Sequence, residues 1–150
     1  MMLKPTKILV PTDFSEYSDR ALAQGLDIAQ HYKAKLFLLH VVHGDIYRSV
    51  LEFTFLEETV RHSIKDRATD WAHDSLQKQL GHFPQAKNVE IVTHVRWGIP
   101  YEEILKEEME KGIDLIVIAT LGRSAIARYL IGNVARNVLK GSKCPVLLTK

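Results

Sequence analysis

Five short apolar runs, rich in Val, Ile and Leu, are the feature that most limits how this chain can fold. They show little polar alternation, which is typical of parallel strands that helices cover on both faces. Longer segments with apolar residues at helical spacing separate them. Because parallel strands need right-handed crossovers, this alternation predicts an α/β fold, a doubly wound open sheet of five parallel strands. The predicted strands are Lys7–Val10, Lys35–Val42, Val89–Val95, Leu115–Ala119 and Pro145–Thr149.

The helical segments are defined by their ends and by their apolar stripes. Ser15 or Ser18 is expected to cap the first helix, and Gly112 and Gly141 to end the third and fourth in left-handed conformation. The five glutamates within residues 102–110, together with Lys106 and Lys111, are expected to form a solvated helix face. The second helix is expected from about Glu52 to Leu80, after a loop at His43–Ser49 that is expected to be the most mobile element. Its stripe comprises Leu56, Val60, Ile64, Ala68, Trp71, Ser75, Leu76 and Leu80.

Composition limits the location and partners of the protein. The 150 residues fit one domain, residues 1–150, and the net charge of +2 gives no reason to expect a nucleic-acid partner. No apolar stretch approaches the roughly 20 residues of a membrane helix, and Ile8–Val10 is too short for a signal-peptide core. Because Cys144 has no second cysteine to pair with, a reducing cytoplasm is expected.

The most informative segment for function runs from Ala119 to Asn133. In an open parallel sheet, ligands bind beyond the carboxyl ends of the strands, where the strand order reverses. If the first and fourth strands are neighbours, Asp13 and Gly122 face one crevice. A glycine admits close backbone approach, and the helix after Gly132 offers free N–H groups to a phosphate. The polar groups that could assist are Asn133 as a cap, Arg123 and Arg128 as cations, and Asp13 as a ribose acceptor. The alternative remains open that the glycines serve tight turns and Asp13 caps the first helix.

Several motifs occur in the order and at the spacing of one known family. They are Ile8-Leu9-Val10-Pro11-Thr12-Asp13-Phe14-Ser15-Glu16, Ala21-Leu22, His40-Val41, Gly98-Ile99-Pro100, Asp114-Leu115-Ile116-Val117, Gly122-Arg123-Ser124 and Cys144-Pro145-Val146-Leu147. On these motifs the chain resembles the universal stress protein family over essentially its whole length. The resemblance implies a Rossmann-like fold of the adenine nucleotide alpha hydrolase type, and a homodimer that pairs through the last strand, Pro145–Thr149.

The nucleotide-binding branch of that family carries a glycine, two residues, a glycine, nine residues, and a glycine followed by serine or threonine. Gly122 and Gly132 keep this spacing, whereas Ala119 replaces the first glycine and Asn133 the hydroxyl residue. Leu121 stands where the family often has histidine. The resemblance implies that the site binds ATP, or ADP or AMP, with Mg²⁺ as a companion ion. The residues expected to bind this cofactor are Pro11, Thr12, Asp13, Val41, Ile118, Ala119, Gly122, Arg123, Gly132, Asn133 and Val134.

No catalytic motif accompanies this site, since the sequence has neither G-x-x-x-x-G-K-[ST] nor G-x-S-x-G. The seven histidines are expected to be structural rather than metal ligands, and Cys144 to be an inert thiol. The expected function is that of a cytoplasmic stress-response protein whose bound adenine nucleotide has a regulatory output. Two alternatives remain, a dimeric interaction module without nucleotide and a weak ATP hydrolase.

Overall fold

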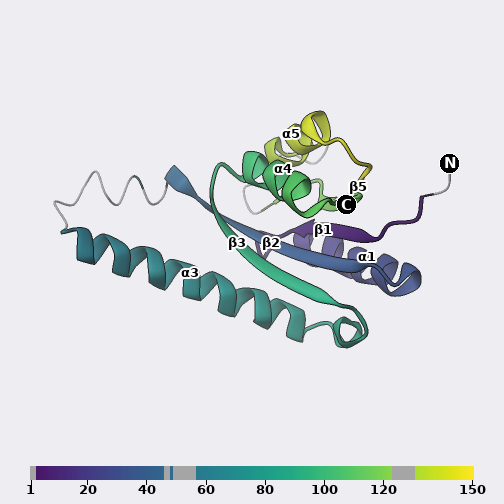
Figure 1. Ribbon diagram of the computed structural model, residues 1–150, viewed down its shortest axis with the longest axis horizontal. Coiled ribbons are helices and arrows are strands. Elements are labelled where there is room, and N and C mark those ends of the chain that lie inside the picture. Colours follow the sequence, from purple (N-terminus) through teal and green to yellow (C-terminus); the bar gives the residue numbers. More distant parts are fainter. Residues whose placement is uncertain (1–2, 46–47, 49–56, 123–130) are drawn as a thin grey trace.

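The computed structural model describes residues 3–45, 48, 57–122 and 131–150. Within this part, five strands form one parallel sheet in the order β3-β2-β1-β4-β5 (Figure 1). The strands are β1 (Lys7–Pro11), β2 (Lys35–His43), β3 (Ile91–Gly98), β4 (Leu115–Ala119) and β5 (Val146–Thr149). The helices are α1 (Glu16–Tyr32), α3 (Glu58–Gly81), α4 (Pro100–Lys111) and α5 (Asn133–Gly141), with a 3₁₀ turn η1 (Pro84–Asn88) before β3.

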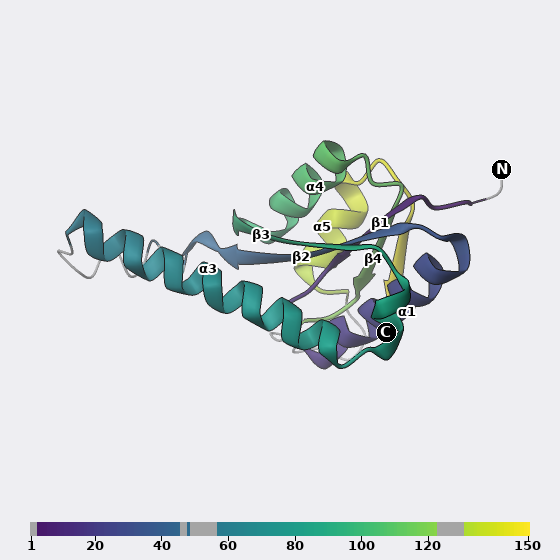
Figure 2. The same ribbon diagram turned by 60° about the horizontal axis from the view of Figure 1, so that its bottom comes forward.

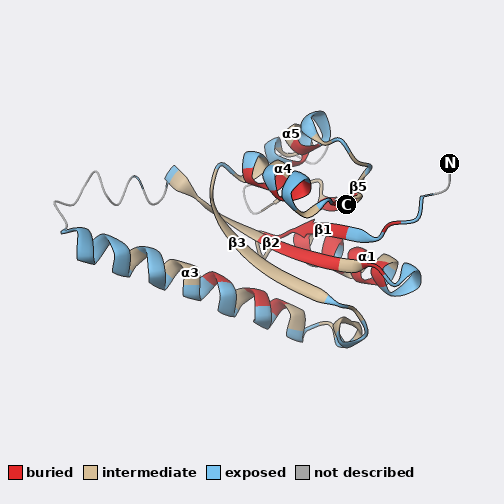
Figure 3. Ribbon diagram, viewed as in Figure 1, coloured by how far each residue is buried: buried red, intermediate tan, exposed pale blue. Residues whose placement is uncertain are grey.

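Helices cover both faces of the sheet. α1 and α3 lie on one face, and α4 and α5 lie on the other (Figures 1 and 2). Strand β1 shows the consequence for side chains, because Ile8 and Val10 join the core under α1 whereas Leu9 joins the core under α4 and α5. Burial follows these layers, with the buried residues along the sheet and on the inner sides of the helices (Figure 3). The doubly wound α/β prediction is therefore confirmed.

The strand order reverses at β1, which pairs in parallel with both β2 and β4. The fourth predicted strand agrees with β4 at both ends, and β1, β2 and β5 each differ from the prediction by one residue at one end. The largest change is in β3, which begins at Ile91 rather than Val89 and runs on to Gly98. The 3₁₀ turn and Val89, which ends it, take up the residues just before this strand. The switch point between β1 and β4 is where the sequence places it.

The long helix α3 is fully buried only at positions in its carboxyl-terminal half. These residues are Ala72, Leu76 and Gln79, whereas Val60 near its start is 40% exposed. Figures 1 and 3 show the amino-terminal half extending away from the core with its surface exposed. The predicted stripe is therefore shallow in its first half, where Ile64 and Ala68 are half-buried and Trp97 of β3 donates to the Thr69 hydroxyl at 3.1 Å. The predicted first residues of this helix, including Leu56, lie outside the described residues, as do residues 46, 47 and 49 of the predicted loop His43–Ser49.

Two of the three predicted helix ends are confirmed. Ser15 caps α1, since its hydroxyl accepts a hydrogen bond from the Ser18 N–H at 3.2 Å, and Gly112 ends α4 with a φ of 65°. The prediction for Gly141 is wrong, because it has no positive φ and is the last helical residue of α5. A Cβ at this position would lie 2.5 Å from Leu105 Cδ1. This glycine therefore allows α5 to pack closely on α4.

The acidic face of α4 is also not solvated as expected, because three of its glutamates are buried. Arg96 on β3 donates to Glu107 Oε2 at 2.9 Å and to Glu103 Oε2 at 3.2 Å, and it also pairs with Glu110. Burial alone would raise the pKa of Glu103, but hydrogen bonds from Lys106 and Arg96 outweigh it and lower that pKa. This cluster fixes α4 to the edge strand β3 and so fixes one wall of the cavity described below.

Glu108 anchors the opposite side of α4 to the connection between α5 and β5. Its Oε1 accepts from the Lys143 N–H at 2.8 Å, the Cys144 N–H at 2.9 Å and the Ser142 hydroxyl at 3.0 Å. The acceptor is the carboxylate of a buried residue, and hydrogen bonds to such a charged group contribute about 1.5–3 kcal/mol each. Helix α4 is thus attached both to β3 and to the segment that follows α5.

Candidate functional site

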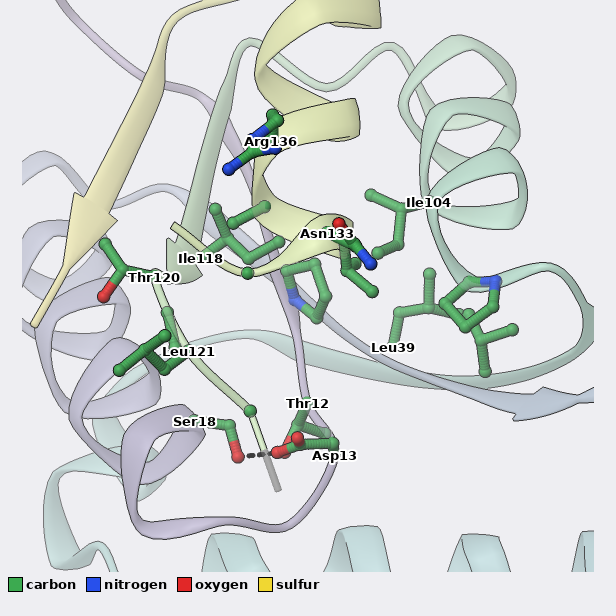
Figure 4. Close-up of a pocket in the computed structure, with 18 of the residues that line it drawn as sticks. Thr12, Asp13, Ser18, Leu39, Ile104, Ile118, Thr120, Leu121, Asn133 and Arg136 are labelled. Carbon is green, nitrogen blue, oxygen red and sulfur yellow. Dashed lines mark hydrogen bonds between the residues drawn. The ribbon is translucent and has the colours of Figure 1, made fainter. Parts of the chain in front are cut away.

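A cavity of about 570 Å³ opens at the carboxyl ends of β1, β2 and β4 (Figure 4). Its walls come from the turn after β1, the end of β2, the start of α4 and the first turn of α5. Every predicted cofactor-binding residue in the described part of the chain lines this one cavity; these are Pro11, Thr12, Asp13, Val41, Ile118, Ala119, Gly122, Gly132, Asn133 and Val134. The remaining candidates, Arg123 and Arg128, lie outside the described residues.

Asp13 and Gly122 meet across the switch point, as the sequence predicted. Asp13 Oδ1 accepts a hydrogen bond from the Ser15 N–H at 3.0 Å, and Oδ2 lies so close to Gly122 that a Cβ there would be 2.5 Å away. Ser15, not Asp13, caps α1, so the alternative capping role for Asp13 is wrong. Gly122 has no positive φ, so this glycine provides room for the carboxylate rather than a left-handed turn.

Gly132 closes the loop that follows β4. Its N–H donates to the carbonyl of Thr120 at 2.7 Å, and a Cβ at Gly132 would lie 3.1 Å from that same oxygen. Gly132 is also the N-cap of α5, and no side-chain cap bond satisfies this helix start in the described part of the chain. The expected capping role of Asn133 is therefore wrong, because Asn133 is already the first helical residue. The first N–H groups of α5 are positioned to receive an acceptor from a ligand.

Thr12 organises the turn that carries Asp13. Its N–H donates to the carbonyl of Leu39 at 2.8 Å, and its own carbonyl accepts from His40 Nδ1 at 2.8 Å. A carbonyl only accepts, so this ring nitrogen must carry its proton. The Thr12 hydroxyl lies 3.0 Å from both Ser18 Oγ and Gln79 Oε1. The turn is thus fixed by β2 on one side and by α1 and α3 on the other, and Figure 4 shows Thr12, Asp13 and Ser18 together at one end of the cavity.

The opposite side of the cavity is more apolar and includes residues that the sequence analysis missed. Leu39 on β2 and Ile104 on α4 form this wall, with Asn133 of α5 near them (Figure 4). Arg136, in the first turns of α5, also lines the cavity, and its guanidinium donates to the carbonyl of Ile131 at 3.4 Å. Its position four residues after Gly132 could have indicated this cation, since a positive charge near a helix start is unfavourable without an anion.

The described residues contain no group of three or more His, Cys, Asp or Glu side chains that could hold a metal ion. His94 Nδ1 lies 2.6 Å from Glu107 Oε2, which agrees with its expected structural role. Burial raises the pKa of the Cys144 thiol to about 11, so this thiol stays protonated at neutral pH. No helix in the part of the chain that the structure describes is long and apolar enough to cross a membrane.

The family model described as "Universal stress protein family" matches residues 5–150. The chain belongs to this family. A curated relative, the universal stress protein MJ0577 of Methanocaldococcus jannaschii, is 31% identical over 157 aligned positions, which cover 96% of this chain and 94% of the relative. The solved structure of MJ0577 superposes with a TM-score of 0.78 at 30% identity and covers 99% of this chain and 97% of that one.

Two further solved universal stress proteins share the fold and hold nucleotides. One is described as a complex with cAMP; it has a TM-score of 0.70 at 23% identity and covers 98% of each chain. The other, from Archaeoglobus fulgidus, is described as a complex with dAMP; it has a TM-score of 0.59 at 19% identity, covering 99% of this chain and all of that one. At these identities the likeness establishes the shared fold.

Proposed function

We propose that this universal stress protein binds an adenine nucleotide, ATP above all, in the cavity at the β1–β4 switch point, and that occupancy regulates its interactions. The observation that carries the proposal is the convergence of ten sequence-predicted residues, from four parts of the chain, on one cavity. The two solved relatives described with cAMP and dAMP support an adenine ligand for the family fold.

The two ends of the cavity suit the two ends of such a ligand. The Asp13 carboxylate can accept hydrogen bonds from ribose hydroxyls, as an acidic group does in many nucleotide-binding sheets. The phosphates would lie at the start of α5, where the helix dipole and free N–H groups favour negative charge. Arg136 adds a full positive charge to the wall near this helix start.

The two departures from the family pattern are compatible with this arrangement. Ala119 is partly buried and packs against the core under α1, so its methyl has protein neighbours on that side. Asn133 lies at the first position of α5, where its amide can donate to a phosphate oxygen. Both residues line the wall of the cavity.

A thermal-shift series with ATP, ADP and AMP, each with and without Mg²⁺, tests the proposal. At a nucleotide concentration 100 times Kd, binding should stabilise the protein by about 2.7 kcal/mol. ATP is expected to give the largest shift. Absence of a shift with all three nucleotides at millimolar concentration would overturn the proposal and favour the interaction-module alternative. Steady phosphate release during the assay would point to the hydrolase alternative.

Gly132→Asp gives a sharp test of the phosphate end. Aspartate is a good N-cap residue, and its Cβ, 3.1 Å from the Thr120 carbonyl oxygen, needs a small shift of the backbone, whereas its charge would repel a phosphate at the start of α5. Nucleotide binding should be lost while the fold persists. Gly81→Asp is the matched control, since nothing lies within 4 Å of a Cβ there. Ala119→Gly should preserve or strengthen binding.

We also propose that the protein forms a homodimer through β5 in the cytoplasm. β5 is an edge strand of the described sheet, and Leu147 on it is 38% exposed. An open edge with apolar side chains is prone to pair with another strand. Sedimentation at micromolar concentration should show a dimer, and Leu147→Lys should shift it toward monomer. The single cysteine supports a reducing compartment.

A further inference from the structure

Helix α3 contacts the Asp13 turn at two places, although α3 itself does not line the cavity. Near its carboxyl end, Gln79 hydrogen-bonds Thr12. Two turns earlier, the Trp71 ring meets the Phe14 ring edge-on, with centroids 5.6 Å apart. Thr12 and Phe14 are the two residues that flank Asp13 in the chain. The conformation of the ligand turn is therefore tied to α3 from both sides of the carboxylate.

Gln79 makes two side-chain hydrogen bonds, one as donor and one as acceptor, so its side chain must carry both kinds of group. Its Nε2 donates to Asp19 Oδ1 at 2.8 Å, and a carboxylate can only accept, so the amide orientation is fixed. Oε1, which can only accept, then faces Thr12 at 3.0 Å and takes the Thr12 hydroxyl proton in place of Ser18 Oγ, which lies at the same distance. Gln79 and Thr12 are only 5% and 6% exposed, so water cannot readily replace these bonds.

The Thr12 hydroxyl passes this constraint on to the backbone of the turn. With its proton directed at Gln79, its oxygen accepts from the Phe14 N–H at 3.1 Å. Phe14 has a φ of 64°, a left-handed conformation that is unfavourable for a residue with a Cβ. Its ring also stacks on His40, with centroids 4.4 Å apart. The strained conformation after Asp13 is therefore held by contacts that α3 and β2 supply.

We infer that Gln79 is a positioning residue for nucleotide binding, because it holds the Asp13 turn in its binding conformation from the neighbouring helix α3. The expected effect of Gln79 on nucleotide affinity rests on the proposed function, whereas its expected effect on the conformation of the turn does not. Through Gln79, the position of α3 also affects the cavity. Any change that shifts α3 changes the population of the turn conformation that binds ligand.

The direct test uses Trp71 as a reporter without any ligand. Trp71 and Trp97 are the two tryptophans of the chain, so a Trp97→Phe background leaves the emission of Trp71 alone. In that background, Gln79→Met should alter the emission maximum or intensity, because the freed turn moves Phe14 relative to the indole. Gln77→Met, the same change on an exposed residue two positions away, should not. Equal spectra for the two variants would overturn the inference.

The functional test measures ATP affinity by calorimetry at a temperature where circular dichroism shows every variant folded. If Gln79→Met leaves the turn in its binding conformation for one-tenth to one-fifth of the time, Kd rises about five- to tenfold. Gln77→Met should stay within twofold of the wild type. A Gln79→Met variant that loses stability but keeps its Kd would show a purely structural role and overturn the inference. Absence of ATP binding by the wild type would overturn the proposed function instead.

Thr12 variants check the route of the effect. Thr12→Val removes the hydroxyl at nearly constant shape, so it should raise Kd as Gln79→Met does, and the double variant should be no worse than either alone. Thr12→Ser keeps the hydroxyl and should retain most of the affinity. Additive losses in the double variant would show that Gln79 acts by another route and would contradict the inference.

Discussion

Substitution of Gly122 by alanine separates ligand binding from folding. The added Cβ would lie 2.5 Å from Asp13 Oδ2, roughly 1 Å short of ordinary van der Waals contact. The carboxylate is the end of a rotatable side chain, so it can move aside. Its bond to the Ser15 N–H is put at risk, and a hydrogen bond to a charged group is worth about 1.5–3 kcal/mol. Because alanine also restricts the unfolded chain by about 0.4–1 kcal/mol, the free energy of unfolding should fall by no more than about 2.6 kcal/mol.

The affinity for the nucleotide should fall as well. A displaced carboxylate loses a charge-assisted hydrogen bond from the ribose, worth about 1.5–3 kcal/mol, so Kd for ATP should rise by about 10- to 150-fold. Calorimetric titration gives Kd, and urea unfolding gives the stability of the same sample. Gly81→Ala is the control, because it adds a methyl where nothing lies within 4 Å. A Kd within twofold of the wild type for Gly122→Ala would refute the assigned position of the ribose.

Three further predictions concern the scaffold. Gly25→Ala places a Cβ 2.6 Å from Val10 Cγ2, so overpacking should exceed the gain in helix propensity and lower the unfolding free energy in urea by about 1 kcal/mol. Arg96→Met leaves the fully buried Glu107 with His94 Nδ1, 2.6 Å away, as its remaining partner, so it should destabilise the protein in the same assay by less than the roughly 3–5 kcal/mol of a buried charge with no partner. Because the pKa of the Cys144 thiol is raised to about 11, its alkylation should be slow at pH 8 and should become tenfold faster with each pH unit up to pH 10. Mass spectrometry would follow the labelling, and complete labelling within minutes at pH 8 would contradict this prediction.

The switch point was predictable because it depends on properties that a sequence states directly. Apolar runs give the strands, right-handed crossovers limit their order, and the carboxyl ends of parallel strands gather at one edge. Asp13 and Gly122 follow two such ends and therefore meet. The role of Gly122 was less accessible, since a glycine needed for a turn and a glycine needed for a neighbour's side chain look alike in sequence.

The partners of the charged and polar side chains on the helices could not be read from the sequence. An i, i+4 charge pattern fits an exposed face of α4, but Arg96 on β3 neutralises that face and buries it. The stripe of α3 gives the side that faces the protein, but not how far the sheet extends beneath it. Gln79 brings together residues from the β1 turn, α1 and α3, and no local spacing encodes a contact among three separate segments.

The bond between the Gly132 N–H and the Thr120 carbonyl has a consequence for engineering the protein. It joins the two ends of the segment 121–131, so β4 and α5 keep their relative placement whatever the length of the chain between them. The entropy of closing a flexible loop grows only with the logarithm of its length, and a doubling costs about 0.6 kcal/mol. Lengthening the chain between Leu121 and Ile131 should therefore cost little stability, which urea unfolding of insertion variants would measure.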